Sequence, residues 1–206
     1  MNILIVPKIY CRFKDQIEYS VEKKLLIFVK KIFPNAKIQI AIKKSIYKKT
    51  RLIILSGGNN IISFSKKKED IERNKIDNYF FKYGIKKKLP IFGICHGTQY
   101  LAKRFGCKFK KTKNHVGNHF VKIIDNQAKK YRQLVNSYHN IIITKKSKNI
   151  DILALCDDSS IEAFRHKKLN VGGIIWHPER FKKFKNRDIN LIKKFYATGN
   201  FSFGKG

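Results

Sequence analysis

The chain has 206 residues, with 46 lysines and arginines against 14 aspartates and glutamates, which gives a formal net charge of +32. Because 43% of its residues are hydrophobic, it is not a disordered basic tail. No run approaches the roughly 18 apolar residues of a membrane-spanning helix. The start, MNILIVPKIYCRF, lacks the features of a signal peptide. We therefore expect a single cytoplasmic domain over residues 1–206, with no membrane partner.

The positive charge raises the question of a nucleic-acid partner, since lysine and arginine release counterions from phosphate backbones. The basic residues are mostly lysines, however, and they are scattered over nearly every segment from Lys8 to Lys205. This distribution favours a solvated surface over a binding stripe. Nucleic-acid binding is therefore not expected, although an anionic small-molecule substrate would be favoured near such a surface.

In the first half of the chain, strand patterns alternate with helix patterns. Continuously apolar runs predict buried strands at residues 2–6, 51–55 and 89–94. An alternating run predicts an edge or half-exposed strand at 37–42. Apolar residues at helical spacing predict helices at 15–33, 69–83 and 98–105. In the first helix, Asp15 and Glu18 resemble a capping box, and Pro34 would end the helix.

The second half is richer in strands, which are predicted at 119–124, 140–145, 151–155, 161–165 and 171–176. A last helix is predicted at 186–197, followed by a Gly-rich end expected to fray. Strands separated by helices in the first half indicate a parallel sheet with right-handed crossovers. We therefore predict a three-layer α/β fold with a mostly parallel central sheet, flanking helices and extra antiparallel strands.

The segment IFGICHGTQYLA, residues 91–102, predicts a nucleophile elbow, in which a buried strand turns directly into a helix. Gly93 and Gly97 stand two residues before and after Cys95, which permits a tight turn. Cys95 would then project at the carboxyl edge of the sheet, beside a helix N-terminus whose partial positive charge favours a thiolate. The alternative is a cysteine that is merely buried at a strand end.

The segment GGIIWHPER, residues 172–180, carries a histidine and a glutamate two apart, His177 and Glu179. Pro178 disfavours helical backbone at His177, and residues i and i+2 of an extended chain point the same way. Glu179 could then orient an imidazole that takes a proton from a thiol. The alternative is a helix start with proline at its first position.

The segment LSGGNN, residues 55–60, follows a predicted buried strand. Its paired glycines can leave backbone N–H groups free to hold an oxyanion. By itself the segment is more typical of an ordinary turn between a strand and a helix.

In this order, the Gly-Gly strand end, the G-x-C-x-G elbow and the late H-P-E resemble the class I glutamine amidotransferase family, and the resemblance covers nearly the whole chain. It implies that family's fold and cleavage of a γ-glutamyl amide. It also implies Cys95 as the nucleophile, His177 as the general base and acid, and Glu179 as its orienter. The backbone N–H groups of Gly58 and His96 would form the oxyanion hole.

A finer resemblance concerns the segment VNSYHN, residues 135–140, which is similar to the V-N-S-x-H of the γ-glutamyl hydrolase-like branch. Within that branch the chain looks most like the γ-glutamyl-CDP-amidate hydrolases of bacterial capsule pathways. Read without the resemblance, the segment is a turn between strands. The residues that the family resemblance implies as substrate contacts are Gly57, Asn59, Gln99, Asn136, Ser137 and Tyr138.

Two departures leave the leaving group open: Thr98 and Asn140 stand where the family often has other residues. The chemistry alone does not separate a hydrolase that acts by itself on a small γ-glutamyl substrate from a glutaminase subunit that delivers ammonia to a partner synthase. VNSYHN favours the first. A basic binding protein that has kept the fold is a third alternative, which the intact Cys, His and Glu set disfavours.

The remaining polar residues carry weaker signals. No metal or other cofactor is expected, because His115 and His119, although four apart, run into a predicted strand rather than a helix. The pair Glu72 and Arg73 is predicted to lie on a helix surface. The cysteines form no C-x-x-C pair, so no disulfide framework is expected, and three of them are predicted to be packing residues: Cys11, Cys107 and Cys156.

Overall fold

The computed structural model describes residues 1–13, 16–45, 47–113, 115–124 and 130–199. Its centre is a sheet of eleven strands that run parallel at one end and antiparallel at the other. From the parallel edge, the strands lie in the order β4 (Lys37–Ile40), β1 (Asn2–Val6), β5 (Thr50–Leu55), β6 (Ile91–Ile94), β13 (Val171–Ile174), β12 (Ile161–His166), β11 (Ile150–Cys156), β8 (Val116–Ile124) and β9 (Lys130–Tyr138).

The first five of these strands pair in parallel and the remaining ones antiparallel. Beside this path, β10 (Ile141–Lys145) pairs with both β12 and β7 (Lys108–Lys111). The sheet confirms the predicted combination of a parallel centre and extra antiparallel strands.

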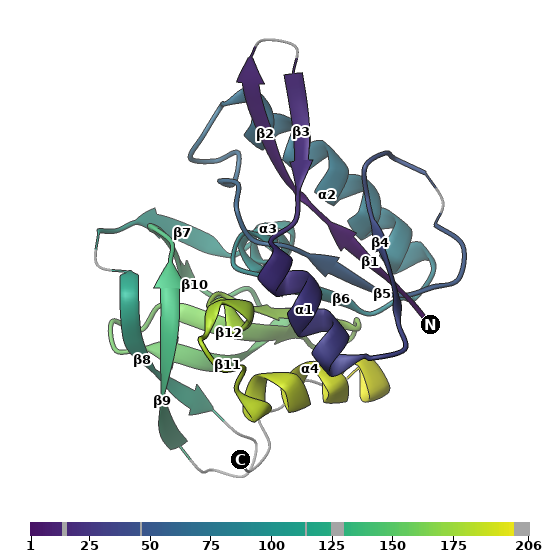
Figure 1. The fold of residues 1–206 in the computed structure, drawn as a ribbon. Helices are drawn as coiled ribbons and strands as arrows, with labels where there is room; N and C mark the ends of the chain where they lie inside the picture. The colour runs from purple at the N-terminus through teal and green to yellow at the C-terminus, as the bar shows by residue number, and fades with distance from the viewer. Residues whose placement is uncertain (14–15, 46, 114, 125–129, 200–206) are drawn as a thin grey trace.

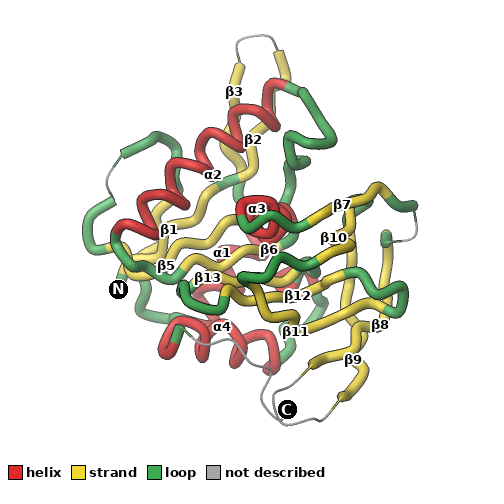
Figure 2. Tube along the Cα trace, turned by 180° about the vertical axis from the view of Figure 1, so that it is seen from behind, coloured by secondary structure: helices red, strands yellow, loops and turns green. Residues whose placement is uncertain are grey.

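Four helices cover the two faces of the parallel half. One face carries α1 (Lys23–Ile32) and α4 (Asn186–Thr198), and the other carries α2 (Lys68–Lys86) and α3 (His96–Arg104), as Figures 1 and 2 show from opposite sides. Strands covered on both faces need apolar residues in succession rather than in alternation.

β1 shows how the apolar succession builds both cores. Ile3 and Ile5 pack toward α1 and α4, while Leu4 and Val6 pack toward α2 and α3. All four side chains are fully buried, so the run NILIV serves two hydrophobic cores at once. None of the described helices is long and apolar enough to cross a membrane.

The predicted helix over 15–33 is wrong in its first part. The segment Gln16–Ser20 is a strand, β3, which pairs antiparallel with β2 (Lys8–Phe13) in a separate hairpin that projects from the molecule in Figure 1. Ile17 and Tyr19 alternate with polar neighbours and lie opposite residues of β2, so strand pairing outweighs the helical spacing of the apolar residues.

Other differences concern elements that the sequence patterns missed or misplaced. The strands β2, β7 and β9 were not predicted, and VNSYHN belongs largely to β9 rather than to a turn. The predicted capping box begins at Asp15, which lies outside the described residues, and the residue that precedes α1 is Glu22. α1 ends before Pro34, as predicted. The fraying expected of the C-terminal end concerns residues 200–206, which are also outside the described part.

Candidate active site

The candidate site lies where three neighbouring parallel strands end. β6 lies between β5 and β13, and the three strands run in the same direction, so their carboxyl ends meet at one edge of the sheet. Cys95 follows β6 directly, the Gly57–Gly58 turn follows β5, and His177 follows β13. The strand order therefore brings the glycine turn to one side of the cysteine and the histidine to the other.

Cys95 has the backbone of a nucleophile elbow. Its φ of +50° and ψ of −106° are unusual for a residue with a side chain, and it directly precedes α3. The glycines around it are required by close packing: a Cβ on Gly97 would collide with the carbonyl of Leu55, and one on Gly93 would lie 2.5 Å from the backbone nitrogen of Thr98. The turn thus holds a strained cysteine that is only 6% exposed.

His177 is oriented by a carboxylate. Its Nδ1 lies 2.6 Å from Oε1 of Glu179, and both residues are buried. Because a carboxylate only accepts hydrogen bonds, Nδ1 carries the proton and Nε2 is left for the thiol side. The backbone differs from the extended one that was predicted: Pro178–Arg180 form a short 3₁₀ turn, η1, and Glu179 reaches back from it.

The electrostatics of the site favour a charged histidine. Burial by itself lowers the pKa of His177, but the charge of Cys95 and its hydrogen bond, together with the Glu179 carboxylate, raise that pKa to about 9. The Cys95 and His177 side chains therefore form an interacting pair, in which the imidazolium is the favoured form near neutral pH.

The glycine turn closes over this pair. A Cβ on Gly57 would lie 2.5 Å from Cε1 of His177 and 3.4 Å from Cβ of Cys95, so only glycine fits between them without a shift. Gly58 has a φ of +126°, a conformation that favours glycine, and it packs against the Lys8 side chain. The amide of His96, in the first turn of α3, belongs to the N–H groups that an α-helix leaves without an internal partner.

A buried ionic network, which the sequence patterns missed, supports both sides of the turn. Arg73 was predicted to be a surface residue but is fully buried. Its Nε lies 2.9 and 3.0 Å from the two carboxylate oxygens of Asp77, and its Nη2 donates to the carbonyl of Ser56 at 2.8 Å. The same Asp77 lies 2.8 Å from Nε2 of His96. α2 thereby ties the residue before Gly57 to the residue after the cysteine.

The charges in this network compensate one another. Burial raises the pKa of Asp77, but the adjacent Arg73 guanidinium and the His96 imidazole outweigh burial and hold that pKa below its ordinary value. Asp77 is therefore an ionised group in the core, which depends on Arg73 for its stability. Arg73 and Asp77 are four residues apart on α2, a spacing that on an exposed face would indicate a weak surface pair.

Asn136 holds the histidine from the opposite half of the sheet. Its side-chain oxygen accepts from the backbone N–H of His177 and its side-chain nitrogen donates to the backbone carbonyl of the same residue, both at 2.8 Å. Ser137 is fully buried and donates to the carbonyl of His115. Tyr138 is half exposed, and its ring lies edge-on to the imidazole of His177 with the centroids 5.5 Å apart.

Two other predicted substrate contacts have structural partners. The side-chain oxygen of Asn59 accepts from the backbone N–H of Ile9 and its side-chain nitrogen donates to the carbonyl of Ile9, each at 2.9 Å, which holds β2 beside the glycine turn. The amide nitrogen of Gln99 donates to the carbonyl of Ile141 at 2.8 Å and joins α3 to β10. Both side chains are buried, Asn59 with 8% and Gln99 with 3% exposed.

A small pocket opens beside Gly57. Residues of the hairpin, of α1 and of the site line it, namely Lys8, Tyr10, Ser20, Glu22, Leu25, Ser56, Gly57 and Glu179. At its rim, Arg180 pairs with Glu22 and its guanidinium lies 4.5 Å from the ring centre of Tyr138. Lys8 is the cation in the pocket lining, while the carboxylates of Glu22 and Glu179 in the same lining are paired with Arg180 and His177.

Comparison with known proteins identifies the family of this chain. The profile of the family described as glutamine amidotransferase class-I matches residues 12–197. A γ-glutamyl-CDP-amidate hydrolase of Campylobacter jejuni is 32% identical over 175 residues, which are 83% of this chain and 84% of that protein. One subunit of a glutamine-hydrolysing GMP synthase of Methanococcus aeolicus is 30% identical over 156 residues, which are 72% of this chain and 74% of that protein.

Solved structures support the fold. A protein of Thermoplasma acidophilum described as a GMP synthase subunit has a TM-score of 0.72 at 19% identity, over 97% of this chain and 94% of that one. A glutamine amidotransferase of Thermotoga maritima has a TM-score of 0.61 at 18% identity, over 86% of this chain and 76% of that one. These similarities confirm the predicted class I glutamine amidotransferase-like fold. With the profile match over most of its length, the chain belongs to the class I glutamine amidotransferase family.

Proposed function

We propose that this protein hydrolyses a γ-glutamyl amide through a thioester formed on Cys95, with His177 and Glu179 completing the catalytic triad. The observation that carries the proposal is the meeting of three groups at one sheet edge: a strained cysteine before a helix, an imidazole paired with a carboxylate at 2.6 Å, and a glycine turn over both. This is the arrangement that acyl transfer to a thiol requires.

In the first half of the reaction, the Cys95 thiolate attacks the γ-carbonyl carbon and a C–S bond forms. The oxygen becomes an oxyanion, which the N–H groups of Gly58 and His96 are proposed to stabilise. The C–N bond then breaks, and the His177 imidazolium gives its proton to the departing nitrogen. Gln99, Asn136, Ser137 and Tyr138 remain candidates for the walls of the glutamyl pocket.

In the second half, water attacks the thioester. Neutral His177 takes a proton from that water, the C–S bond breaks, and glutamate leaves while the thiolate and imidazolium are restored. Glu179 keeps the proton on Nδ1 throughout, so that Nε2 can exchange protons with the leaving group and with water. No cofactor takes part in the proposed reaction.

For the leaving group, we propose a nucleotide amidate such as the CDP-amidate that the name of the Campylobacter jejuni relative contains. Lys8 in the pocket lining supports this choice, because a diphosphate brings negative charge that glutamine lacks. A second candidate is a glutaminase subunit that passes ammonia to a partner synthase, which the similarity to a GMP synthase subunit favours.

A substrate panel separates these functions. Purified protein is incubated alone with glutamine, γ-glutamyl amines and a γ-glutamyl nucleotide amidate, and glutamate release is followed by mass spectrometry. Turnover of one conjugate at a kcat/KM well above that of glutamine supports the stand-alone hydrolase. Slow glutamine hydrolysis that rises only with an added synthase supports the glutaminase role. Absence of any turnover, with Cys95 unlabelled by a glutamine-mimicking electrophile, would refute both.

The pH dependence should report the pKa of His177. Because the leaving nitrogen needs the proton of the imidazolium, kcat/KM should fall as the pH rises through about 9. Glu179 raises this pKa, so the Glu179→Gln variant should move the alkaline limb to lower pH by about one pH unit. As a control, Glu72→Gln, which removes a carboxylate on α2, should leave the alkaline fall of kcat/KM at the same pH as in the wild type. A limb that stays near pH 9 in the Glu179 variant would contradict the assignment.

Salt should distinguish the substrates. Between about 50 and 200 mM salt, KM for the nucleotide amidate should rise, since only this substrate brings phosphate charge to the site, while KM for glutamine should hardly change. The Lys8→Gln variant should raise KM for the nucleotide amidate alone. Lys193→Gln, an exposed lysine on α4, is the matched control. If KM for both substrates depends equally on salt, the nucleotide amidate is excluded as the substrate and a γ-glutamyl amine is favoured.

A further inference from the structure

Three histidines and one glutamate meet in the antiparallel half of the sheet, at a site separate from Cys95. The carboxylate of Glu162, on β12, is fully buried. Its Oε1 lies 3.5 Å from Nδ1 of His115 and 3.6 Å from Nε2 of His139, and its Oε2 lies 3.7 Å from Nε2 of His119. The four side chains come from segments at β8, β9 and β12 that are distant in the sequence.

The hydrogen-bond partners of two rings fix their tautomers. Nε2 of His115 lies 2.9 Å from a carboxylate oxygen of Asp158, and Nδ1 of His139 lies 3.1 Å from the carbonyl of Ile141. Carboxylate and carbonyl oxygens only accept, so each of these nitrogens carries its ring's proton. In the neutral rings, the other nitrogen of each then directs a lone pair toward Glu162.

These facing atoms have no hydrogen-bond partner among the described residues. Both oxygens of Glu162, Nδ1 of His115 and the Nε2 atoms of His119 and His139 are buried and unsatisfied. Lone pairs and a carboxylate that face one another in a buried site repel unless a proton or a metal cation lies between them. At 3.5–3.7 Å, the separations exceed the 2.7–3.2 Å typical of N–H···O hydrogen bonds, so a proton fits them poorly.

A metal ion fits these separations between the histidine nitrogens and the Glu162 oxygens better than a proton does. Zinc lies about 2.0–2.1 Å from imidazole nitrogen and carboxylate oxygen, so tetrahedral ligand atoms are about 3.3 Å apart. The hydrogen bond from His115 to Asp158 is also the outer carboxylate contact that metal-bound histidines commonly make. We propose that His115, His139 and Glu162, whose ligand atoms all lie within 4.8 Å of one another, bind one divalent transition-metal ion, with zinc the best match to these ligands. His119 lies at the edge of this group, beside the other carboxylate oxygen of Glu162.

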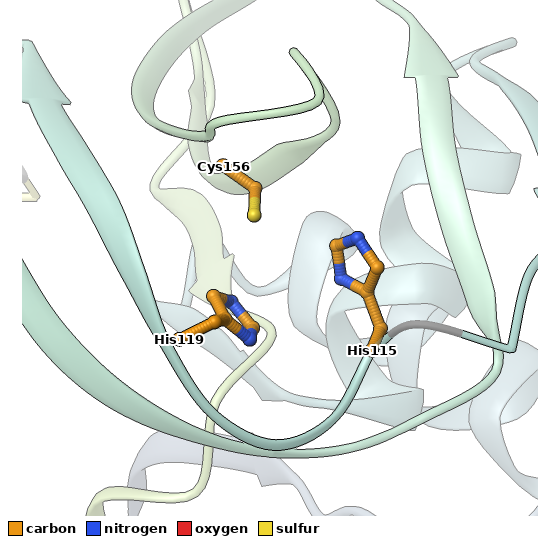
Figure 3. Close-up of side chains that lie close together, drawn as sticks. All are labelled: His115, His119 and Cys156. Atoms are coloured by element: carbon orange, nitrogen blue, oxygen red, sulfur yellow. The ribbon is translucent and has the colours of Figure 1, made fainter.

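Cys156 is a competing ligand. Its thiol lies at the end of β11 and forms a second group with the rings of His115 and His119, in which the ligand atoms also all lie within 4.8 Å of one another. Figure 3 shows these three side chains close together. We assign the ion to the Glu162 side, because a fully buried carboxylate with two unsatisfied oxygens needs a cation more than a thiol does.

The bound ion would have a structural role close to the catalytic histidine. Ser137, which donates to the carbonyl of His115, is the neighbour of Asn136, which holds the backbone of His177. The ion would cross-link β8, β12 and the end of β9 and thereby fix the strand that carries Asn136. The inference does not depend on the substrate or on the proposed reaction.

Metal content and affinity test the site directly. The full chain, purified without a polyhistidine tag, should contain about one equivalent of zinc, and after removal by a chelator it should rebind one equivalent of Zn²⁺ in competition with a chromophoric chelator. Glu162→Gln and His139→Asn should weaken Zn²⁺ binding by about 100-fold or more. Should either variant fail to fold, His115→Asn, which removes the remaining ligand of the group, provides the same measurement.

Three controls keep the assignment specific. His166→Asn changes a histidine on the same strand as Glu162 and should bind Zn²⁺ as the wild type does. The titration is repeated in the Cys95→Ala protein, where the catalytic thiol cannot contribute. Cys156→Ser should also bind normally; loss of binding in this variant, with Glu162→Gln unaffected, would overturn the assignment to Glu162.

Stability and spectroscopy give readouts that are independent of activity. Zn²⁺ should raise the Tm of the stripped wild type and leave that of Glu162→Gln unchanged. Co²⁺ in the site should show the visible bands of tetrahedral coordination without a thiolate charge-transfer band. A stripped wild type whose Tm does not respond to Zn²⁺, and which binds it no better than Glu162→Gln, would show that protons alone balance Glu162 and would refute the metal site.

Discussion

Replacing Cys95 with alanine is expected to lower the turnover of every γ-glutamyl substrate by about 10⁵-fold or more, because Cys95 is the group that forms the thioester in the proposed mechanism. His177→Ala should cost about as much. Glu179→Ala should retain about 10–100-fold more activity than either, since Glu179 orients the imidazole but carries no proton in the reaction. Glutamate release, measured at saturating substrate for each folded variant, checks this hierarchy.

The matched control is Cys107→Ala. Cys107 is buried to the same degree as Cys95, with 7% against 6% exposed, but it follows α3 and packs in the core. Its variant should keep near-wild-type kcat. In the native protein, Cys95 should also react with a glutamine-mimicking electrophile ahead of the other three cysteines. Equal labelling of all four, or a folded Glu179→Ala as inactive as Cys95→Ala, would contradict the proposed roles.

The second large effect concerns the network under the glycine turn. Arg73→Met should lower the free energy of unfolding by about 3–5 kcal/mol, because it leaves the ionised carboxylate of Asp77 buried without its main partner. The double variant Arg73→Met with Asp77→Leu should recover much of that loss, since the uncompensated charge is gone. Urea unfolding followed by circular dichroism measures both.

An exposed pair on the same helix provides the control. Lys75 and Glu72 form an ion pair near the surface, and Lys75→Met should change stability by less than about 0.5 kcal/mol. The Arg73→Met, Asp77→Leu double variant should also have a lower kcat, because α2 then no longer holds the carbonyl of Ser56 or the imidazole of His96. A single Arg73 variant as stable as the Lys75 variant would mean that Asp77 is neutral or hydrated in the core.

The parts of the site that the sequence predicted are those encoded next to strand ends. Cys95 follows its strand directly, and His177 follows its own after two residues, so recognising parallel strands is enough to bring them to one edge. Two short segments therefore predicted the candidate site, and the structure brings Cys95 and His177 to the same sheet edge. The fold class followed from the same alternation of strands and helices.

The contacts that the sequence did not predict join residues to partners that a local sequence pattern cannot reveal. Arg73 and Asp77 have the spacing of a surface pair, and only the packing of α2 against the sheet buries them. The contact from Asn136 to His177 joins residues 41 positions apart and exists only because β9 closes the antiparallel half. Likewise, β3 became a strand because β2 was available to pair with it, which the helical spacing of its apolar residues could not indicate.

In the proposed mechanism, the position of β13 sets the time at which the thiol of Cys95 gains its base during synthesis. β13 lies between β6 and β12, both of which precede it in the chain, so among the described strands it is the last to be made and the one that joins the two halves of the sheet. A growing chain therefore presents Cys95 long before His177 leaves the ribosome. Nascent or prematurely terminated chains carry Cys95 without its proposed base, so under the proposed mechanism hydrolysis would begin only when the sheet is complete.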